Sequence, residues 1–193
     1  MLADKLDRLL AAFKARGRHP DLRPGATEVE LDQIEEALEL PLPDELRALW
    51  AWRNGHTQQI PQSYDTGFVF RDKFFTGTPE VPKIRKMVLL EASEPEEWRK
   101  RTFDPVICIP FAIGGGFTVV SCGPQGDAPH LPNSVLELQG EIVTAYESIE
   151  KMIDTNIEIR EVVGRIGSKA DREKAWEIRR KHNPLIPIFQ GRS

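Results

Sequence analysis

Apolar residues recur at helical spacing near both ends of the chain and form short runs through its middle. One amphipathic helix is predicted over residues 2–16, with an apolar face made of Leu2, Leu6, Leu9, Leu10 and Phe13. Residues 17–25 contain two glycines and two prolines, which indicates a linker. A second helix is predicted after Thr27, because Thr27 and Glu30 have the spacing of a capping box. Its inward face would consist of Leu31, Ile34 and Leu38.

The stretch LPLPDELRALWAWRNGH, residues 40–56, has the pattern of a proline corner followed by a helix. Pro41 has no amide hydrogen and should end the preceding helix, whereas Pro43 suits the first position of the next one. We expect Gly55 to terminate that helix in a left-handed conformation. The predicted buried face consists of Leu46, Leu49 and Trp50. Trp52 falls on a different face and is expected to be partly exposed.

The middle of the chain changes from helical spacing to strand-like runs. Strands are predicted at 67–75, 106–112, 116–122, 134–139 and 142–146. The last two should pair as a hairpin. Further helices are predicted after the capping residues Ser93, Ser148 and Ser168, the first containing Trp98 and the last spanning 169–181. This order predicts an α+β fold, with a mostly antiparallel sheet, an N-terminal helix pair and C-terminal helices packed around it.

Composition excludes several classes of protein. The net charge is −4 and the isoelectric point is about 5.7, so direct binding to nucleic acid is not expected. No stretch approaches the roughly 20 apolar residues of a membrane span, and the N-terminus lacks the continuous apolar region of a signal peptide. These features predict a cytoplasmic protein that binds no membrane. Cys108 and Cys122 are expected to be small, buried side chains in neighbouring strands.

Charge is distributed unevenly along the chain. Residues 26–45 include eight acids and no Lys or Arg, whereas residues 160–193 carry nine basic residues and four acids. Charge runs of this kind are usually solvated helical faces. The acidic run also fits a surface that attracts a basic partner, and the sequence leaves both interpretations open.

Three blocks of the chain carry a family resemblance. The first is an acidic helix, then L-P-x-D/E, then a helix that ends in an aromatic residue and Asn-Gly; its positions are Leu42, Pro43, Asp44, Leu46, Trp50, Asn54 and Gly55. The second is CIPFAIGGGFTVVSC, in which Gly114, Gly115 and Gly116 separate two strands, and the third is VLELQGEIVTAYESIEKMI. Together the blocks resemble the SUKH superfamily, which includes fungal cell-wall-assembly regulators. Ile113 and Phe117 depart from it, since the family commonly has polar residues around these glycines.

The resemblance covers about residues 26–155 and implies a compact α+β fold used for protein binding. Many bacterial members look like immunity proteins that neutralise secreted toxins, a role that needs no catalysis. We expect an N-terminal helix and linker at 1–25, a SUKH-like domain at 26–160, and a basic C-terminal helix and tail at 161–193 packed on the same domain.

Motifs for chemistry are missing from the sequence. The three glycines match neither a phosphate-binding loop nor a dinucleotide-binding motif, since no Lys-Ser/Thr follows them and position 119 is valine. The histidines do not have metal-ligand spacing, and there is no G-x-S-x-G. Asp127 and His130 share a loop and could contact a metal, but no other ligand type lies near them. We therefore expect no enzymatic activity, no cofactor and no metal.

The leading hypothesis is an immunity protein that binds and neutralises a cognate toxin with a basic surface. The alternative is a housekeeping regulatory or scaffold protein of the same fold, and an unrecognised enzyme is the third hypothesis. The candidate partner-binding residues are Glu28, Asp32, Glu35, Glu36, Glu39, Trp52 and His56. The loops at 56–66 and 123–133 are secondary candidates.

Overall fold

The computed structural model describes residues 1–15, 17, 19–57, 73–93, 104–123, 131–139, 142–164 and 166–186. The helices before and between the strands are α1 (Leu2–Lys14), α2 (Glu28–Leu38), α3 (Asp44–Trp52) and α4 (Val81–Ser93). The strands are β1 (Phe74–Phe75), β2 (Cys108–Ile113), β3 (Phe117–Ser121), β4 (Val135–Leu138) and β5 (Ile142–Tyr146). They are followed by α6 (Ile149–Glu158), a π-helical turn η2 (Ile159–Val163) and α7 (Lys169–His182), and a 3-10 turn η1 (Pro105–Ile107) precedes β2.

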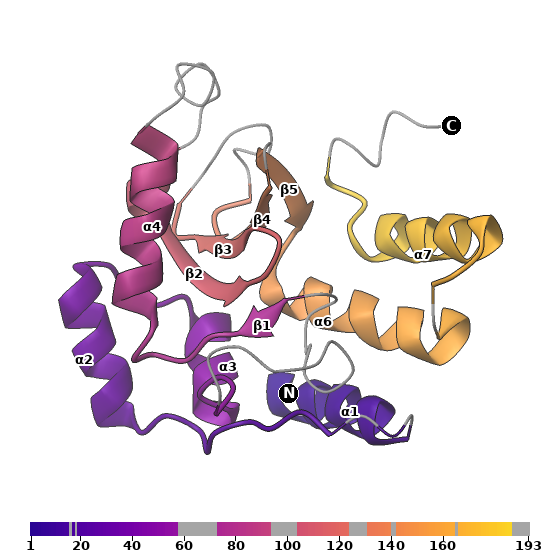
Figure 1. Ribbon diagram of the computed structural model, residues 1–193, viewed down its shortest axis with the longest axis horizontal. Helices are drawn as coiled ribbons and strands as arrows, with labels where there is room; N and C mark the ends of the chain where they lie inside the picture. Colours follow the sequence, from indigo (N-terminus) through magenta and orange to yellow (C-terminus); the bar gives the residue numbers. More distant parts are fainter. Residues whose placement is uncertain are drawn as a thin grey trace.

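The strands form one antiparallel meander in the order β1-β2-β3-β4-β5, which confirms the α+β prediction (Figure 1). In the β2–β3 hairpin Ile113 pairs with Phe117, and the Gly114 amide donates to the Gly116 carbonyl at 2.9 Å. A Cβ on Gly116 would stand 2.2 Å from the Leu138 carbonyl oxygen of β4, so a side chain there would collide with the neighbouring strand. The three glycines are thus a turn inside the sheet, as predicted.

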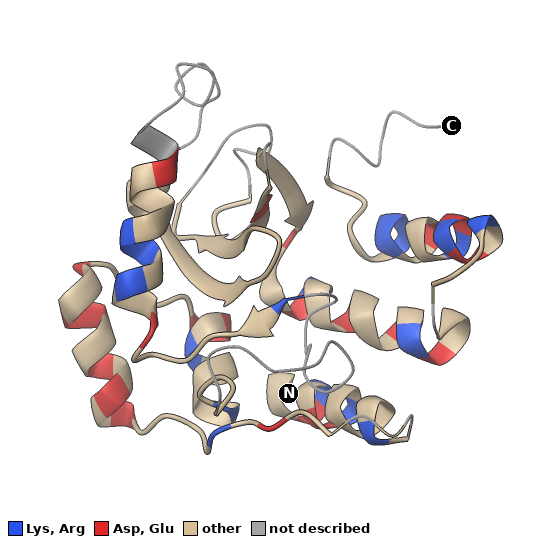
Figure 2. Cartoon of the chain, in the orientation of Figure 1, with Lys and Arg blue, Asp and Glu red and all other residues tan. Residues whose placement is uncertain are grey.

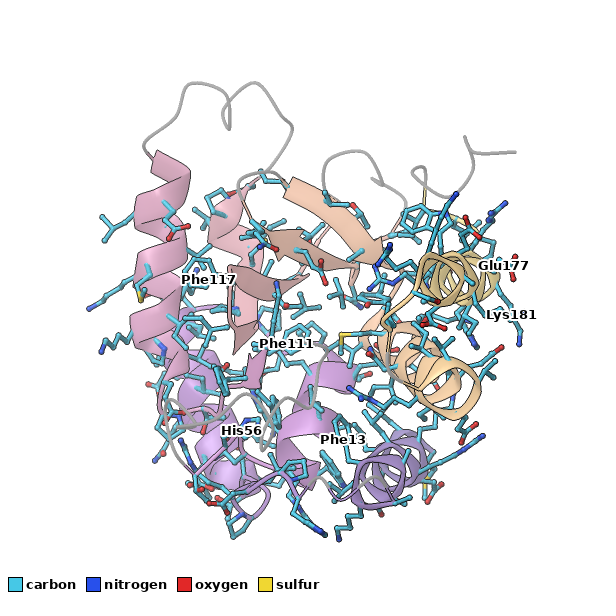
Figure 3. All side chains as sticks on the ribbon, turned by 45° about the vertical axis from the view of Figure 1, so that its right-hand side comes forward. Phe13, His56, Phe111, Phe117, Glu177 and Lys181 are labelled. Atoms are coloured by element: carbon cyan, nitrogen blue, oxygen red, sulfur yellow. The ribbon has the colours of Figure 1, made fainter. Side chains whose placement is uncertain are left out.

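The two faces of the sheet bury separate apolar clusters, because successive side chains of a strand point to opposite sides. Phe111 and Val120 contribute to the larger cluster, which α1, α2, α3 and α6 complete. Phe117 and Val119 contribute to the smaller one, which Ile84 and Val88 of α4 cover. Figure 3 shows Phe111 on the side of α3 and Phe117 on the side of α4. Helices therefore pack against both faces of the sheet.

Helix starts follow the predicted capping residues. Thr27 and Glu30 form a capping box on α2, and Ser168 and Asp171 form one on α7. The Ser148 hydroxyl accepts the Lys151 amide hydrogen at the start of α6. The predicted inward residues of α2 and α3 are all buried: Leu31, Ile34, Leu38, Leu46, Leu49 and Trp50. No helix of the described segments is long and apolar enough to cross a membrane.

The structure differs locally from the sequence predictions, and some of those predictions lie outside the described residues. Pro43 is the residue before α3 and not its first helical position, since α3 begins at Asp44. Helix α4 was not predicted. Only Val81, Ile84 and Val88 of its described side chains form its buried face, and prolines flank the first of them in the sequence. Of the strand predicted at 67–75, β1 is the part inside the described residues, and the predicted helix around Trp98 lies outside them.

The terminal helices are attached in different ways. α1 packs against α3 and α6 and buries Leu6, Leu9 and Phe13 in the main core. α7 packs against α6 and η2 and buries Ala175 and Ile178. The division of the chain at residues 25 and 160 stays a prediction.

Candidate protein-interaction surface

The Asn54–Gly55 pair joins segments that are distant in the sequence. The buried Asn54 side chain accepts the Thr78 amide hydrogen at 2.7 Å and donates from Nδ2 to Thr78 Oγ1 at 3.0 Å. The Asn54 amide donates to the Pro24 carbonyl at 3.1 Å. These bonds fasten the end of α3 to the linker before α2 and to the segment that leads into α4. The pair is a structural junction and presents little surface.

Gly55 has a φ of 78° and lies against Gly77, where a Cβ on Gly55 would stand 2.2 Å from the Gly77 nitrogen. Both facts require glycine, which alone combines positive φ with such close backbone approach. The left-handed conformation was predicted correctly, but its role was not. α3 ends at Trp52 and is followed by Arg53 in extended conformation, so Gly55 serves backbone packing beyond the helix.

Arg47, on α3, neutralises one side of the acidic helix α2. Its Nη2 lies 2.7 Å from Glu28 Oε2 and also contacts Asp32 Oδ1, and its Nη1 lies 2.7 Å from Glu35 Oε2. The bonds to Asp32 and Glu28 raise the pKa of Arg47 above its ordinary value. The base missing from the acidic run thus stands just beyond it in the sequence. Glu28, Asp32 and Glu35 therefore have a counter-charge within the fold and need no external cation.

Glu35 has a second structural role in the corner between α2 and α3. Its Oε1 accepts the Leu42 amide hydrogen at 2.6 Å while its Oε2 accepts from Arg47. The side chain is 29% exposed, less than half the exposure of Glu28 or Asp32. A substitution at Glu35 would disturb the corner itself, so this residue is a poor probe of partner binding.

Glu36 and Glu39 remain as exposed acids of α2, and neither has an ion pair or side-chain hydrogen bond with any described residue. Glu39 follows the helix in a left-handed conformation, with φ 54°. Figure 2 shows the acidic positions distributed along α2. These two are the carboxylates of the predicted acidic surface that have no counter-charge among the described residues.

Trp52 and His56 are buried, contrary to the exposure expected for a partner surface. Trp52 is 9% exposed and donates from Nε1 to Asp7 on α1 at 2.7 Å, because α1 packs on that side of α3. His56 is 5% exposed, and its amide donates to the Phe75 carbonyl at 3.0 Å (Figure 3). Both side chains link elements of the fold, so we remove them from the candidate surface.

Between β1 and α4 lies a groove of about 210 Å³. Its apolar lining includes Phe74, Ile84 and Met87. On its polar side Arg23 forms a two-pronged ion pair with Glu80, and both side chains are less than a quarter exposed. No sequence pattern predicted this groove, because helix α4, which forms one of its walls, was not predicted.

Metal chemistry has no support in the described part of the chain, where no three His, Cys, Asp or Glu side chains are grouped to hold an ion. Asp127 and His130 lie outside the described residues, as do most of the two candidate loops. Cys108 is buried in β2, whereas Cys122 follows β3 and is only half-buried. Burial raises the pKa of the Cys122 thiol to about 11, which disfavours the nucleophilic thiolate at neutral pH.

Residues 25–155, from the linker before α2 to most of α6, match the SMI1/KNR4 family, also designated SUKH-1. The chain belongs to this family. The match confirms the resemblance inferred from the three sequence blocks. No curated protein matches the chain to a significant degree. Helices α1 and α7 of this SMI1/KNR4 protein lie outside the matched residues.

The residues that carried the SMI1/KNR4 resemblance are mostly structural. Leu42, Leu46 and Trp50 are buried, and Trp50 donates from Nε1 to the Thr76 carbonyl at 2.9 Å. Pro43 accepts the amide hydrogens of the first turn of α3. Asp44 is an exception, because it is exposed at the start of that helix. These contacts maintain the corner between α2 and α3.

Proposed function

We propose that this chain is an immunity protein that binds a cognate secreted toxin and neutralises it in the cytoplasm of the producing cell. Membership of the SMI1/KNR4 family supports a non-catalytic interaction module. The observation that carries the finer proposal is the pair of exposed carboxylates, Glu36 and Glu39, at the end of α2 that Arg47 does not neutralise.

The proposed partner is a toxin domain with a basic surface, such as the rim of a cleft that acts on nucleic acid. Acidic rim residues mainly accelerate association with such a surface, and salt screens the effect within a Debye length of about 8 Å at physiological ionic strength. Binding to the toxin would block its cleft without any reaction on this chain. The protein itself needs no contact with nucleic acid or membrane.

The test begins with the neighbouring genes, where we expect a large secreted protein with a variable C-terminal domain. Co-expression of that domain with this chain should restore growth, and the purified proteins should form a stable complex. If no such neighbour exists and the chain instead binds housekeeping proteins, the regulatory alternative replaces the toxin proposal.

The surface is tested with Glu36→Lys/Glu39→Lys, which avoids the structural residue Glu35. We expect association with the toxin domain to slow by about tenfold at low salt and by less at high salt. The matched control is Glu173→Lys/Glu177→Lys on α7, which makes the same change in net charge; Glu177 lies on the outer side of that helix (Figure 3). Equal association rates for both variants would place the interface elsewhere.

A further inference from the structure

The outer face of α4 combines basic and apolar side chains. Val81, Ile84 and Val88 point into the fold, so the opposite side of the helix faces solvent. That side carries Lys86 and Leu90, and Leu90 is 67% exposed; Lys83 and Met87, the latter 39% exposed, lie at its edge and also line the groove next to β1. Neither lysine forms an ion pair with a described residue. We call these four residues the α4 stripe.

The outer face of α2 has the complementary composition. Val29 is 64% exposed, and Gln33 and Glu36 follow it at helical spacing. The side chains of Gln33 and Glu36 have no hydrogen bond or ion pair within the described segments. We call these three residues the α2 stripe. It offers an acid beside an apolar residue, where the α4 stripe offers bases beside apolar residues.

Helices α2 and α4 are neighbours in the fold. Arg85 of α4 donates from Nη1 to the Leu38 carbonyl at the end of α2 at 3.1 Å. A shallow hollow of about 220 Å³ beside α2 is lined by Glu30, Gln33 and Ile34 of α2 and by Thr78 and Pro79 before α4. Figure 2 shows the acidic positions of α2 next to the basic half of α4. An acidic helix and a basic helix therefore stand together on the molecule.

We propose that this face binds a second copy of the chain across a two-fold axis, with the α2 stripe of each copy on the α4 stripe of the other. A two-fold axis makes every contact twice, so Glu36 meets Lys83 and Lys86 in both halves of the interface. Val29 of each copy covers Met87 and Leu90 of the other. Charge complementarity selects this occupant, because the chain's own α2 supplies the acidic and apolar chemistry that the α4 stripe requires.

The dimer has a consequence for partner binding, although it does not depend on the proposed function. It would cover Glu36, so a basic partner that uses α2 would compete with the second copy. A chain that is monomeric in solution would refute the dimer and leave the immunity proposal intact. A chain that forms the dimer but has no toxin partner would support the dimer and refute the immunity proposal.

Sedimentation velocity of the full chain at several concentrations and at low salt is the test. The wild type should show a monomer–dimer equilibrium that weakens as salt rises, because screening shortens the range of the ion pairs. Lys83→Glu/Lys86→Glu and Gln33→Lys/Glu36→Lys should each raise the dimer dissociation constant at least tenfold. An equimolar mixture of the two variants should restore dimerisation, since each then offers what the other lacks.

The matched control for the lysine variant is Arg172→Glu/Lys174→Glu on exposed positions of α7, which changes the net charge equally and should leave the dimer unchanged. Circular dichroism melts check that the variants are folded. Three results would each overturn the proposal: a wild type that stays monomeric at every concentration, a dimer that resists both charge reversals, or a mixture that remains monomeric.

Discussion

Two helix pairs in this molecule are joined by charge in opposite ways. At the corner between α2 and α3 one cation, Arg47, forms ion pairs with three carboxylates. Between α6 and α7 one carboxylate, Glu158, contacts both Lys181 and His182. His182 Nε2 lies 2.7 Å from Glu158 Oε2. In both cases a run of like charges in the sequence is partly neutralised by a single residue on the neighbouring helix.

The pairs differ in what lies beneath the charges. The corner covers fully buried residues of the main core, among them Leu31, Leu46 and Trp50. Under α7 the key residue is polar: the buried Asn183 donates from Nδ2 to Thr155 Oγ1 at 3.1 Å and accepts the Glu147 amide hydrogen at 3.0 Å. A destabilising substitution at the corner should therefore unfold the whole domain. One at the contact between α6 and α7 should cause only local opening of α7.

Trp50→Ala should have the largest effect, because it removes a fully buried indole and its bond to the Thr76 carbonyl. Truncation of a buried Trp costs about 3–5 kcal/mol of unfolding free energy. Thermal melts followed by circular dichroism should show a sharply lower midpoint for the whole domain. A variant as stable as the wild type that fails to bind its partner would show that Trp50 belongs to an interface.

Asn183→Ala should have the next largest effect, confined to the C-terminal part. It leaves a buried Thr155 hydroxyl and the Glu147 amide without this partner, at a cost of about 1–3 kcal/mol. Hydrogen exchange should accelerate in α7 while the protection of β2 and β3 stays unchanged. Faster exchange across the entire sheet would mean that α7 unfolds together with the core.

Arg47→Ala should destabilise the corner, since three carboxylates of α2 would then repel one another without a counter-charge. Arg47→Lys should recover only part of the loss, because an ammonium group cannot reach three acceptors in the fixed geometry of a guanidinium. Urea unfolding at low and high salt measures both variants. Identical midpoints for wild type and Arg47→Ala would show that the ion pairs contribute nothing to stability.

Glu158→Gln should give the smallest effect, and it should depend on pH. Hydrogen bonds from Lys181 and His182 lower the pKa of Glu158 in the fold. A carboxyl with a lowered folded pKa stabilises the fold above its unfolded pKa, and this contribution disappears as the pH falls through the folded value.

The Glu158→Gln variant should consequently protect α7 from exchange less than the wild type at pH 7. The two proteins should converge well below about pH 4, the ordinary range of a glutamate, once intrinsic exchange rates are corrected for pH. A difference that persists undiminished in acid would assign the stabilisation to packing of the side chain and not to its charge.

Local signals predicted the parts of the fold that local chemistry governs. The capping boxes at Thr27 and Ser168 and the turn at the three glycines depend on residues a few positions apart, so the sequence displays them directly. Helix α4 was not predicted because it has few buried apolar residues. These residues are buried only through contact with strands of the sheet that lie later in the sequence. The burial of Trp52 and His56 was not predicted for the same reason, since α1 and β1 cover them from a distance in the sequence.

The sequence by itself determined the family, the α+β class, and the buried faces of α2 and α3, because periodicity and capping act over one or two helical turns. Only the tertiary structure decided which acids remain available to a partner. Ion pairs depend on the distance between charges in space, and Arg47 reaches Glu28, Asp32 and Glu35 only after α3 has folded back against α2. The same packing leaves Glu36 exposed and without an ion pair to any described residue, so the usable charge pattern of the surface is a property of the assembled fold.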